Sequence, residues 1–299
     1  MQIEIPLVIF TLFDGLAIGA TAWAVAAEWL DWTGQTEPHR ELAQWGAYLA
    51  LVCLAIGLLA SPFHLGRPLA MLNGLSNLGS SWIAREALFG LVYLALAAVY
   101  AGAWLLRRRV SLARGWRFVL ANLAGLAALA MIISQAMIYT VVRTIPTWNN
   151  SLTLLFFGVS AALLGTLLVG SGLVVLEALT KSPADKTRLA ALLPPVVRVG
   201  IWAVIGAILV GALQLVNIGA TPSAAASSAL RLLTGPLIGL VSLRFVVGML
   251  VPLVLLGAAW VQARREPQRI GTWLIASFGC VLVGELAARA LFFLSALHI

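Results

Sequence analysis

Long apolar runs separated by short polar segments make up most of the chain. Eight of these runs are long enough to cross a hydrocarbon core of ~30 Å, which takes ~20 residues of helix. The predicted spans are 5–30, 42–63, 82–106, 118–141, 152–180, 189–218, 236–262 and 270–297. No alternation typical of strands interrupts them, and a helix satisfies its own backbone hydrogen bonds inside a membrane. The pattern therefore predicts an all-α, polytopic membrane helix bundle with eight transmembrane helices.

The composition agrees with this prediction. Of the 299 residues, 62% are hydrophobic and 10% are charged, whereas a soluble domain is ~45–50% apolar and ~25% charged. The longest polar stretch is a loop, so we expect residues 1–299 to form a single integral-membrane domain. The N-terminus carries Glu4 in place of the basic segment of a cleavable signal peptide.

The basic residues indicate an orientation. Twelve of the Lys and Arg residues lie in the loops after the first, third, fifth and seventh spans, and three lie in the other loops. Loops rich in Lys and Arg stay in the cytoplasm. Both termini and the loops 63–81, 142–151 and 219–235 are therefore expected outside. The net charge of +8 then reflects membrane orientation, and no nucleic-acid partner is expected.

Polar residues inside the predicted spans gather in the outer half of the bundle. Ionisable residues within spans are costly and usually serve a function or pair with one another. The outer set is Asp14, His64, Arg85, Glu86, Gln135, Tyr139, Arg244, Glu285 and Arg289. On the inner side only Glu177 and Arg198 stand out. A channel needs a polar lining across the whole membrane, so a one-sided cluster favours a quinol pocket, with an apolar cleft for the tail and polar groups for the head.

The segment 63–68 is the most informative. His64 ends a span, Gly66 and Pro68 break the helix, and Arg67 lies between them. Oxidation of a quinol releases two protons. A histidine titrates near neutrality, at ~6.5 when unperturbed, and a carboxylate at the membrane edge can relay a proton. We expect His64 and Glu86 to accept the hydrogens. The further candidates for binding the head group are Arg67, Arg85, Tyr139, Trp148 and Asp14.

Each candidate has a structural alternative, which the sequence leaves open. The alternatives are a helix-end cap for His64, an interfacial ion pair for Arg85 and Glu86, an ion-pair network for Arg244, Glu285 and Arg289, a water-filled crevice for Asp14, and an interfacial contact for Trp148.

The histidine and cysteine residues limit the cofactors. A transmembrane b-haem usually needs two axial histidines in the bundle, and neither His39 nor His298 lies at a depth to partner His64. Cys53 and Cys280 are isolated, and two such residues hold neither an iron–sulfur cluster nor zinc. We expect no haem and no metal site.

Several short motifs, taken together, resemble a known family. They are His64-Leu65-Gly66-x-Pro68, Asn73-x-Leu75-x-x-x-Gly79, Glu86, Thr144-x-Pro146-Thr147-Trp148 and Gly284-Glu285-x-x-x-Arg289-x-x-Phe292. In order and spacing the protein resembles the membrane-anchor subunit of dimethyl-sulfoxide reductase. That subunit belongs to a haem-free, quinol-interacting group that includes the polysulfide reductase anchor.

The resemblance implies a function in anaerobic respiratory electron transport. It implies a complex with an iron–sulfur subunit and a molybdopterin catalytic subunit, whose cofactors lie only in those partners. Menaquinol would be oxidised near His64 and Glu86, on the periplasmic face of a bacterial inner membrane, so this protein would perform only the quinol dehydrogenase half-reaction. Three alternatives stay open: a quinone-reducing anchor of a sulfite- or sulfur-oxidising complex, a small-solute transporter, and a purely structural anchor.

Overall fold

The computed structural model describes residues 4–34, 39–64, 75–107, 113–180, 183–262 and 270–296. Its long helices are α1 (Ile5–Trp32), α2 (His39–Ala60), α4 (Trp82–Leu105), α5 (Arg114–Thr140), α6 (Leu152–Thr180), α7 (Pro183–Ala220), α10 (Val251–Gln262) and α11 (Ile270–Leu294). The shorter elements are η1 (Ser61–His64), η3 (Leu75–Asn77), α8 (Ala224–Thr234), α9 (Ile238–Ser242) and the π-helix η4 (Leu243–Leu250). No strand occurs in the described ranges.

The eight predicted spans are confirmed. Eight helical segments among the described residues are long and apolar enough to cross a membrane. The seventh differs from a plain helix, because α9, η4 and α10 follow one another along it from Ile238 to Gln262. The segment 219–235, which the sequence predicts to be a loop, contains the helix α8. Ser223 is the N-cap of α8, and its hydroxyl accepts a hydrogen bond from the Ala226 amide at 3.1 Å.

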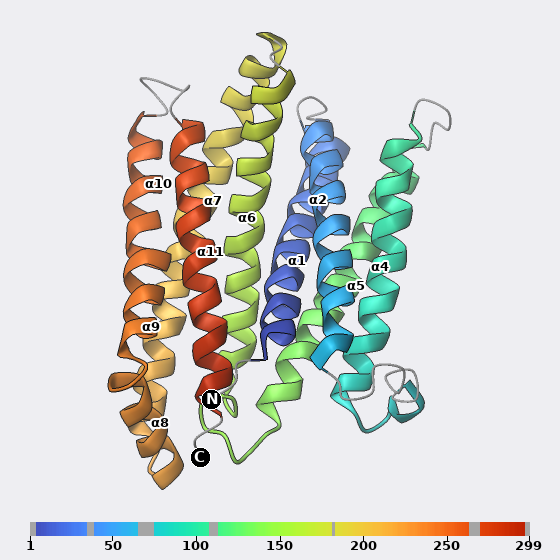
Figure 1. Ribbon diagram of the computed structural model, residues 1–299. Helices are drawn as coiled ribbons and strands as arrows, with labels where there is room; N and C mark the ends of the chain where they lie inside the picture. Colours follow the sequence, from blue (N-terminus) through green and yellow to red (C-terminus); the bar gives the residue numbers. More distant parts are fainter. Residues whose placement is uncertain are drawn as a thin grey trace.

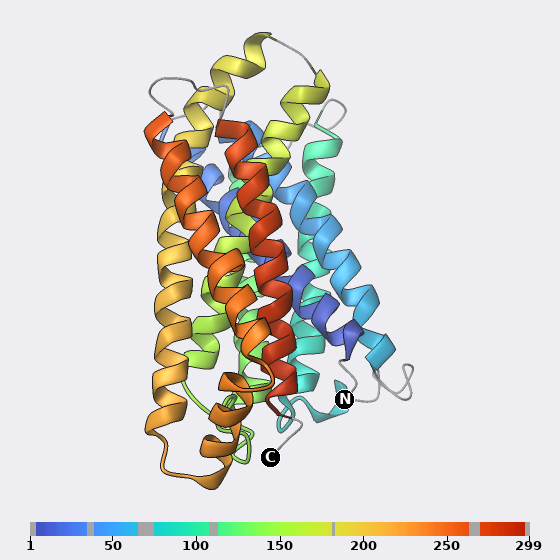
Figure 2. The ribbon, with the colours of Figure 1, turned by 60° about the vertical axis from the view of Figure 1, so that its left-hand side comes forward.

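The spans fall into two bundles, which Figure 1 shows side by side. The N-terminal bundle contains α1, α2, α4 and α5, and the C-terminal bundle contains α6, α7, the α9–η4–α10 segment and α11. Packing of α1 against α6 joins the two bundles. The start of α1 and the end of α11 lie at one end of the molecule together with α8, and we call this end the α8 end (Figures 1 and 2).

Glycines allow the closest helix approaches. Gly19 of α1 faces Gly165 of α6 backbone to backbone, and a side chain on either glycine would overlap the other helix. Gly248 of η4 and Gly284 of α11 make a similar contact in the C-terminal bundle. Small residues are common at such crossings, because apolar lipid leaves close packing as a main source of helix association.

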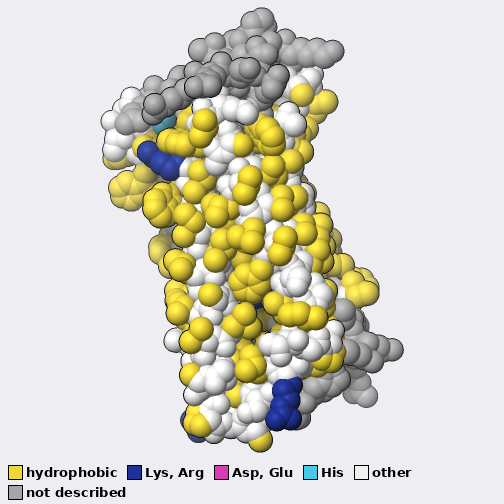
Figure 3. Space-filling view, turned by 90° about the vertical axis from the view of Figure 1, so that its left-hand side faces the viewer, with side chains coloured by type: hydrophobic (Ala, Val, Ile, Leu, Met, Phe, Trp, Pro, Cys, Tyr) yellow, Lys and Arg dark blue, Asp and Glu magenta, His cyan; other side chains and the backbone are white. Residues whose placement is uncertain are grey.

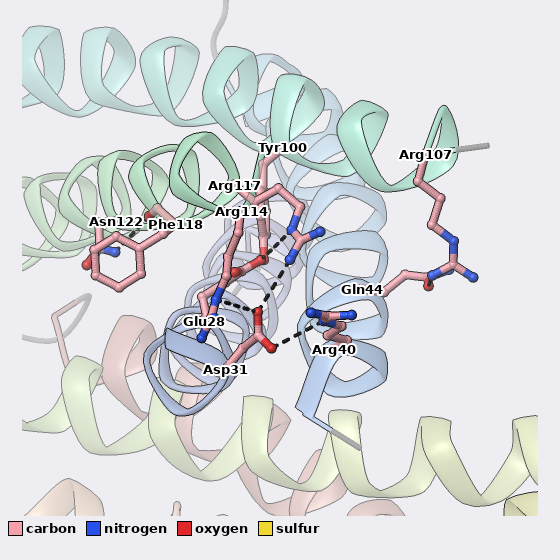
Figure 4. A network of polar contacts seen from close by, with 10 residues as sticks. All are labelled: Glu28, Asp31, Arg40, Gln44, Tyr100, Arg107, Arg114, Arg117, Phe118 and Asn122. Carbon is pink, nitrogen blue, oxygen red and sulfur yellow. Dashed lines mark hydrogen bonds and ion pairs between the residues drawn. The ribbon is translucent and has the colours of Figure 1, made fainter. Parts of the chain in front are cut away.

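A buried acidic pair lies at the end opposite α8, where the sequence had indicated only Glu177 and Arg198. Glu28 and Asp31, in the last turns of α1, are each 1% exposed. The Tyr100 hydroxyl donates to Glu28 at 2.9 Å. Arginines from α2 and α5 surround the two acids: Arg40, Arg114 and Arg117, with N–O distances of 3.2 to 3.6 Å (Figure 4). The expectation that buried charge belongs to one side was therefore wrong, and this cluster ties the N-terminal bundle together at its other end.

Candidate functional site

A cavity of about 490 Å³ opens in the N-terminal bundle towards the α8 end. Residues of α1, α2, η1, α4 and α5 line it, and most are apolar, such as Phe10, Leu58 and Leu94. Only two of the described lining side chains carry an ionisable group, Glu86 and Tyr139. Pockets for small molecules commonly combine apolar walls of this extent with a few polar groups.

Local sequence places Glu86 in this cavity. Ser81 caps α4, its hydroxyl accepting from the Ala84 amide at 3.3 Å, so Glu86 falls in the second turn of the helix. Opposite it, α2 ends at Ala60, because Pro62 has no N–H and disfavours an α conformation at Ser61. The backbone then continues as η1, and Ser61 lines the cavity.

Of the two predicted site residues His64 and Arg67, the structure describes only the backbone of His64. The backbone of His64 ends η1, three residues after Ser61 of the cavity wall. The side chain of His64 and the whole of Arg67 lie outside the described residues. The structure therefore brings Glu86 and Tyr139 together in the lining of one cavity, and the backbone of His64 ends η1, the element that contributes Ser61 to that lining.

Arg85 has a different position from its neighbour Glu86. Its guanidinium donates to the carbonyl oxygens of Leu78 and Gly79 at 2.8 and 2.6 Å, and it stacks 4.2 Å from the ring centre of Trp82. No ion pair joins it to Glu86 among the described residues, and it does not line the cavity. Arg85 thus fixes the η3–α4 connection, from which Glu86 extends.

Tyr139 separates the cavity from an aromatic cluster. Its ring lies 4.9 Å from the rings of both Trp148 and Phe292, measured between centroids. The indole nitrogen of Trp148 donates to the Phe292 carbonyl at 2.7 Å. Trp148 therefore lies behind Tyr139, where it holds the loop 142–151 against α11.

Asp14 lies behind Glu86, in the protein interior. It is fully buried, and its Oδ2 accepts from the Gln135 amide at 3.2 Å, whereas its Oδ1 has no hydrogen-bond partner among the described residues. The Gln135 side chain also interacts with Glu86. One amide of α5 thus lies between a carboxyl of the cavity wall and a carboxyl of the interior.

The predicted network of Arg244, Glu285 and Arg289 is confirmed for two of its members. Arg289, 1% exposed, forms an ion pair with Glu285 and donates to Ser160 at 2.9 Å and to the Thr11 carbonyl at 3.2 Å. Arg244 forms no ion pair with a described residue. No group of three His, Cys, Asp or Glu side chains suited to a metal ion occurs in the part of the protein that the structure describes.

These features define a class: a polytopic helical membrane protein with a mainly apolar, carboxyl-bearing cavity at one end of its first four-helix bundle. A family model for the DMSO reductase anchor subunit (DmsC) matches residues 1–294, and the protein belongs to this family.

Known relatives are similar in sequence over part of their length. One of the proteins that make up the anaerobic dimethyl sulfoxide reductase of Haemophilus influenzae is 35% identical over 158 residues, 50% of this sequence and 51% of the relative. A component of the sulfite dehydrogenase of Allochromatium vinosum is 33% identical over 126 residues, 39% of each sequence. The match spans about half the length of the curated reductase relatives.

A solved structure shares the fold. The bd oxidase from Geobacillus thermodenitrificans superposes with a TM-score of 0.70 over 99% of this protein and 85% of the oxidase polypeptide, at 11% identity. At this identity the likeness shows the fold alone.

Proposed function

We propose that this protein is the haem-free membrane anchor of a molybdopterin oxidoreductase, and that it oxidises menaquinol in the cavity at Glu86. The observation that carries the proposal is a carboxyl group in a mainly apolar pocket of about 490 Å³, lined in part by the η1 segment that ends at His64. Apolar walls suit an isoprenoid-bearing ring, and Glu86 and Tyr139 offer an acceptor and a hydroxyl to its two oxygens.

In the proposed reaction the protein itself supplies only groups that accept protons. A quinol loses two protons and two electrons to become a quinone. In the proposal Glu86 accepts one proton and His64 the other, and both groups lie at the membrane edge, from which protons can reach water. The electrons pass to an iron–sulfur subunit and then to a molybdopterin catalytic subunit, so residues 1–299 act as a single anchor domain without a redox cofactor of their own.

Binding of a quinol analogue to the purified protein tests the site. His64→Ala and Glu86→Gln should each weaken binding about tenfold or more, since a lost charge-assisted hydrogen bond is worth roughly 1.5–3 kcal/mol. Glu177→Gln, the same chemical change near the other end of α6, serves as the matched control and should bind normally. Unchanged affinity in both site variants would remove the assignment.

A second direction of electron flow has one observation in its favour, the similarity to a sulfite dehydrogenase component. In that case quinone would be reduced, and the Glu86 end, with the partners docked on it, would face the cytoplasm. The loop charges favour the first orientation, with the α8 end in the periplasm of a bacterial inner membrane.

Topology reporters fused after Thr221 and after Ala113 distinguish the two orientations. We expect a periplasm-active reporter, such as alkaline phosphatase, to be active at Thr221 and inactive at Ala113. The reverse pattern would support the quinone-reducing alternative.

A further inference from the structure

A second cavity, in the C-terminal bundle, contains a cation without a partner among the described residues. It lies between α6, α7, η4 and α11, has a volume of about 50 Å³, and includes Arg244 in its lining. The Nε of Arg244 is buried and has no hydrogen-bond partner, and no described carboxylate lies within ion-pairing distance. The negative charge of Glu285 attracts Arg244, but Glu285 is already ion-paired with Arg289 and accepts a hydrogen bond from the Ser160 hydroxyl.

The surroundings of Arg244 orient the guanidinium without neutralising it. Its Cζ lies 5.0 Å from the ring centre of Phe156 and 5.7 Å from that of Phe245. Such cation–π contacts are worth roughly 0.5–2 kcal/mol, and the aromatic rings supply no negative charge to balance the guanidinium. Gln214 lines the same cavity and forms no hydrogen bond in the described structure. Two donors therefore line one cavity, and the Nε of Arg244 lacks an acceptor there.

The backbone at this point is also unusual. Arg244 is carried by the π-helix η4, whose bonding runs to the fifth residue, as from the Val251 amide to the Val246 carbonyl. π-Helical turns within α-helices are rare and often mark functional sites. Here the π-helix also carries the close contact of Gly248 with Gly284, and Arg244 of the same element lines the cavity.

The cavity lies near the α8 end of the seventh span, within reach of a lipid head group at that edge. Arg244 is six residues into the span that begins at Ile238, about 9 Å at ~1.5 Å per residue. Other lining residues belong to helix ends: Ile218 near the end of α7, Leu233 in α8 and Ser295 just after α11. In Figure 3 this face is mainly hydrophobic, as a lipid-facing surface is, and it is hollowed in its lower half.

We infer that this cavity binds the phosphate of an acidic phospholipid, with Arg244 and Gln214 as donors. One water occupies roughly 10–15 Å³ measured in this way, so about 50 Å³ accommodates the free oxygens of one phosphate. An anion at this place supplies the charge that no described side chain provides, while the acyl chains stay in the bilayer. The lipid would brace η4 and α11 at the end of the molecule where α8 lies.

Lipid retention on the full-length protein tests the inference. The protein is placed in nanodiscs of phosphatidylcholine with or without phosphatidylglycerol, released, and examined by native mass spectrometry for retained lipid. Wild type should retain one phosphatidylglycerol. Arg244→Gln should weaken retention about tenfold or more, because a charge-assisted contact is lost, and Gln214→Leu should weaken it less while leaving the cation in place.

Arg231→Gln is the matched control, because this arginine lies in the last turn of α8 at the same end but outside the cavity. It should retain lipid like wild type. Equal retention by wild type and by both cavity variants would overturn the inference. Inorganic phosphate added to phosphatidylcholine discs should not bind in place of the lipid, and binding of equal strength would overturn the assignment to a lipid.

Discussion

At the scale of single residues, the contact between Asp14 and Gln135 is the most enclosed polar contact beside the proposed quinol site. Both residues are at most 1% exposed, and the Gln135 amide is the single hydrogen-bond partner of the Asp14 carboxyl among the described residues. A buried polar group that loses its partner pays its full desolvation cost, which exceeds the net gain from making the bond. This asymmetry makes Gln135 more important to folding than the net gain from its hydrogen bond to Asp14 suggests.

Gln135→Leu should therefore lower the free energy of unfolding by about 1–3 kcal/mol, because it leaves both oxygens of Asp14 without a donor. Denaturant unfolding in detergent measures this change. Adding Asp14→Leu to the same protein removes the orphaned carboxyl, and the double variant should be closer to wild type than the sum of the two single changes. Simple additivity would show that the contact contributes little.

Single residues also show what sequence could and could not predict. Glu86 stands out in the sequence because a carboxyl in an apolar run is rare, and this rarity is visible without a structure. Asp14 and Trp148 are candidates for the same head group, yet only Glu86 of these three lines the cavity. Depth follows from position along a helix, but the direction of a side chain follows from rotation about the helix axis. In a membrane both lipid and core are apolar, so the periodicity that reveals this rotation in soluble helices is weak.

At the scale of elements, the bundles are joined by an approach of α1 and α6 that glycine alone permits. Gly19 and Gly165 face each other so closely that a Cβ on either would overlap backbone atoms, which cannot move aside as a flexible side chain can. The position of α6 against α1 brings Ser160 to Arg289 and Tyr139 to Phe157. The aromatic wall behind the cavity therefore depends on this crossing.

Gly165→Ala should destabilise the protein by roughly 1–3 kcal/mol, as overpacking of a close interior does. Gly158→Ala on the same helix is the matched control, because a Cβ at Gly158 meets nothing within 4 Å. Alanine has the higher helix propensity, so the control should be neutral or slightly more stable. Thermal unfolding in detergent compares the two, and equal stability would mean that α1 and α6 can separate without cost.

Elements also differ in how far the sequence defined them. The spans were predicted to within a few residues, since their length follows from membrane thickness. The helix α8 and the π-helix η4 were not predicted. The apolar run at 243–250 reads like any other span, and its π-helical bonding follows from tertiary packing, including the contact between Gly248 and Gly284.

At the scale of the whole molecule, buried charge occurs at both ends, and the cavity of about 490 Å³ lies at one of them. The cluster at Glu28 and Asp31 is matched by three arginines. The cavity at Glu86 is at the α8 end, where η1 also lies. In the proposed function protons and electrons thus leave the quinol at the same membrane surface, the electrons towards a partner docked there.

This geometry predicts that turnover moves little or no charge across the membrane. In proteoliposomes of the assembled complex, with menaquinol and the terminal electron acceptor, a potential-sensitive dye should stay at its baseline while the acceptor is consumed. A protonophore should leave the rate unchanged, because no gradient opposes turnover. A potential that builds with turnover and collapses with the protonophore would require a proton route from Glu86 through to the Glu28 end. Asp14 and Gln135 would be the first groups on such a route, so Asp14→Asn would then have to abolish the potential.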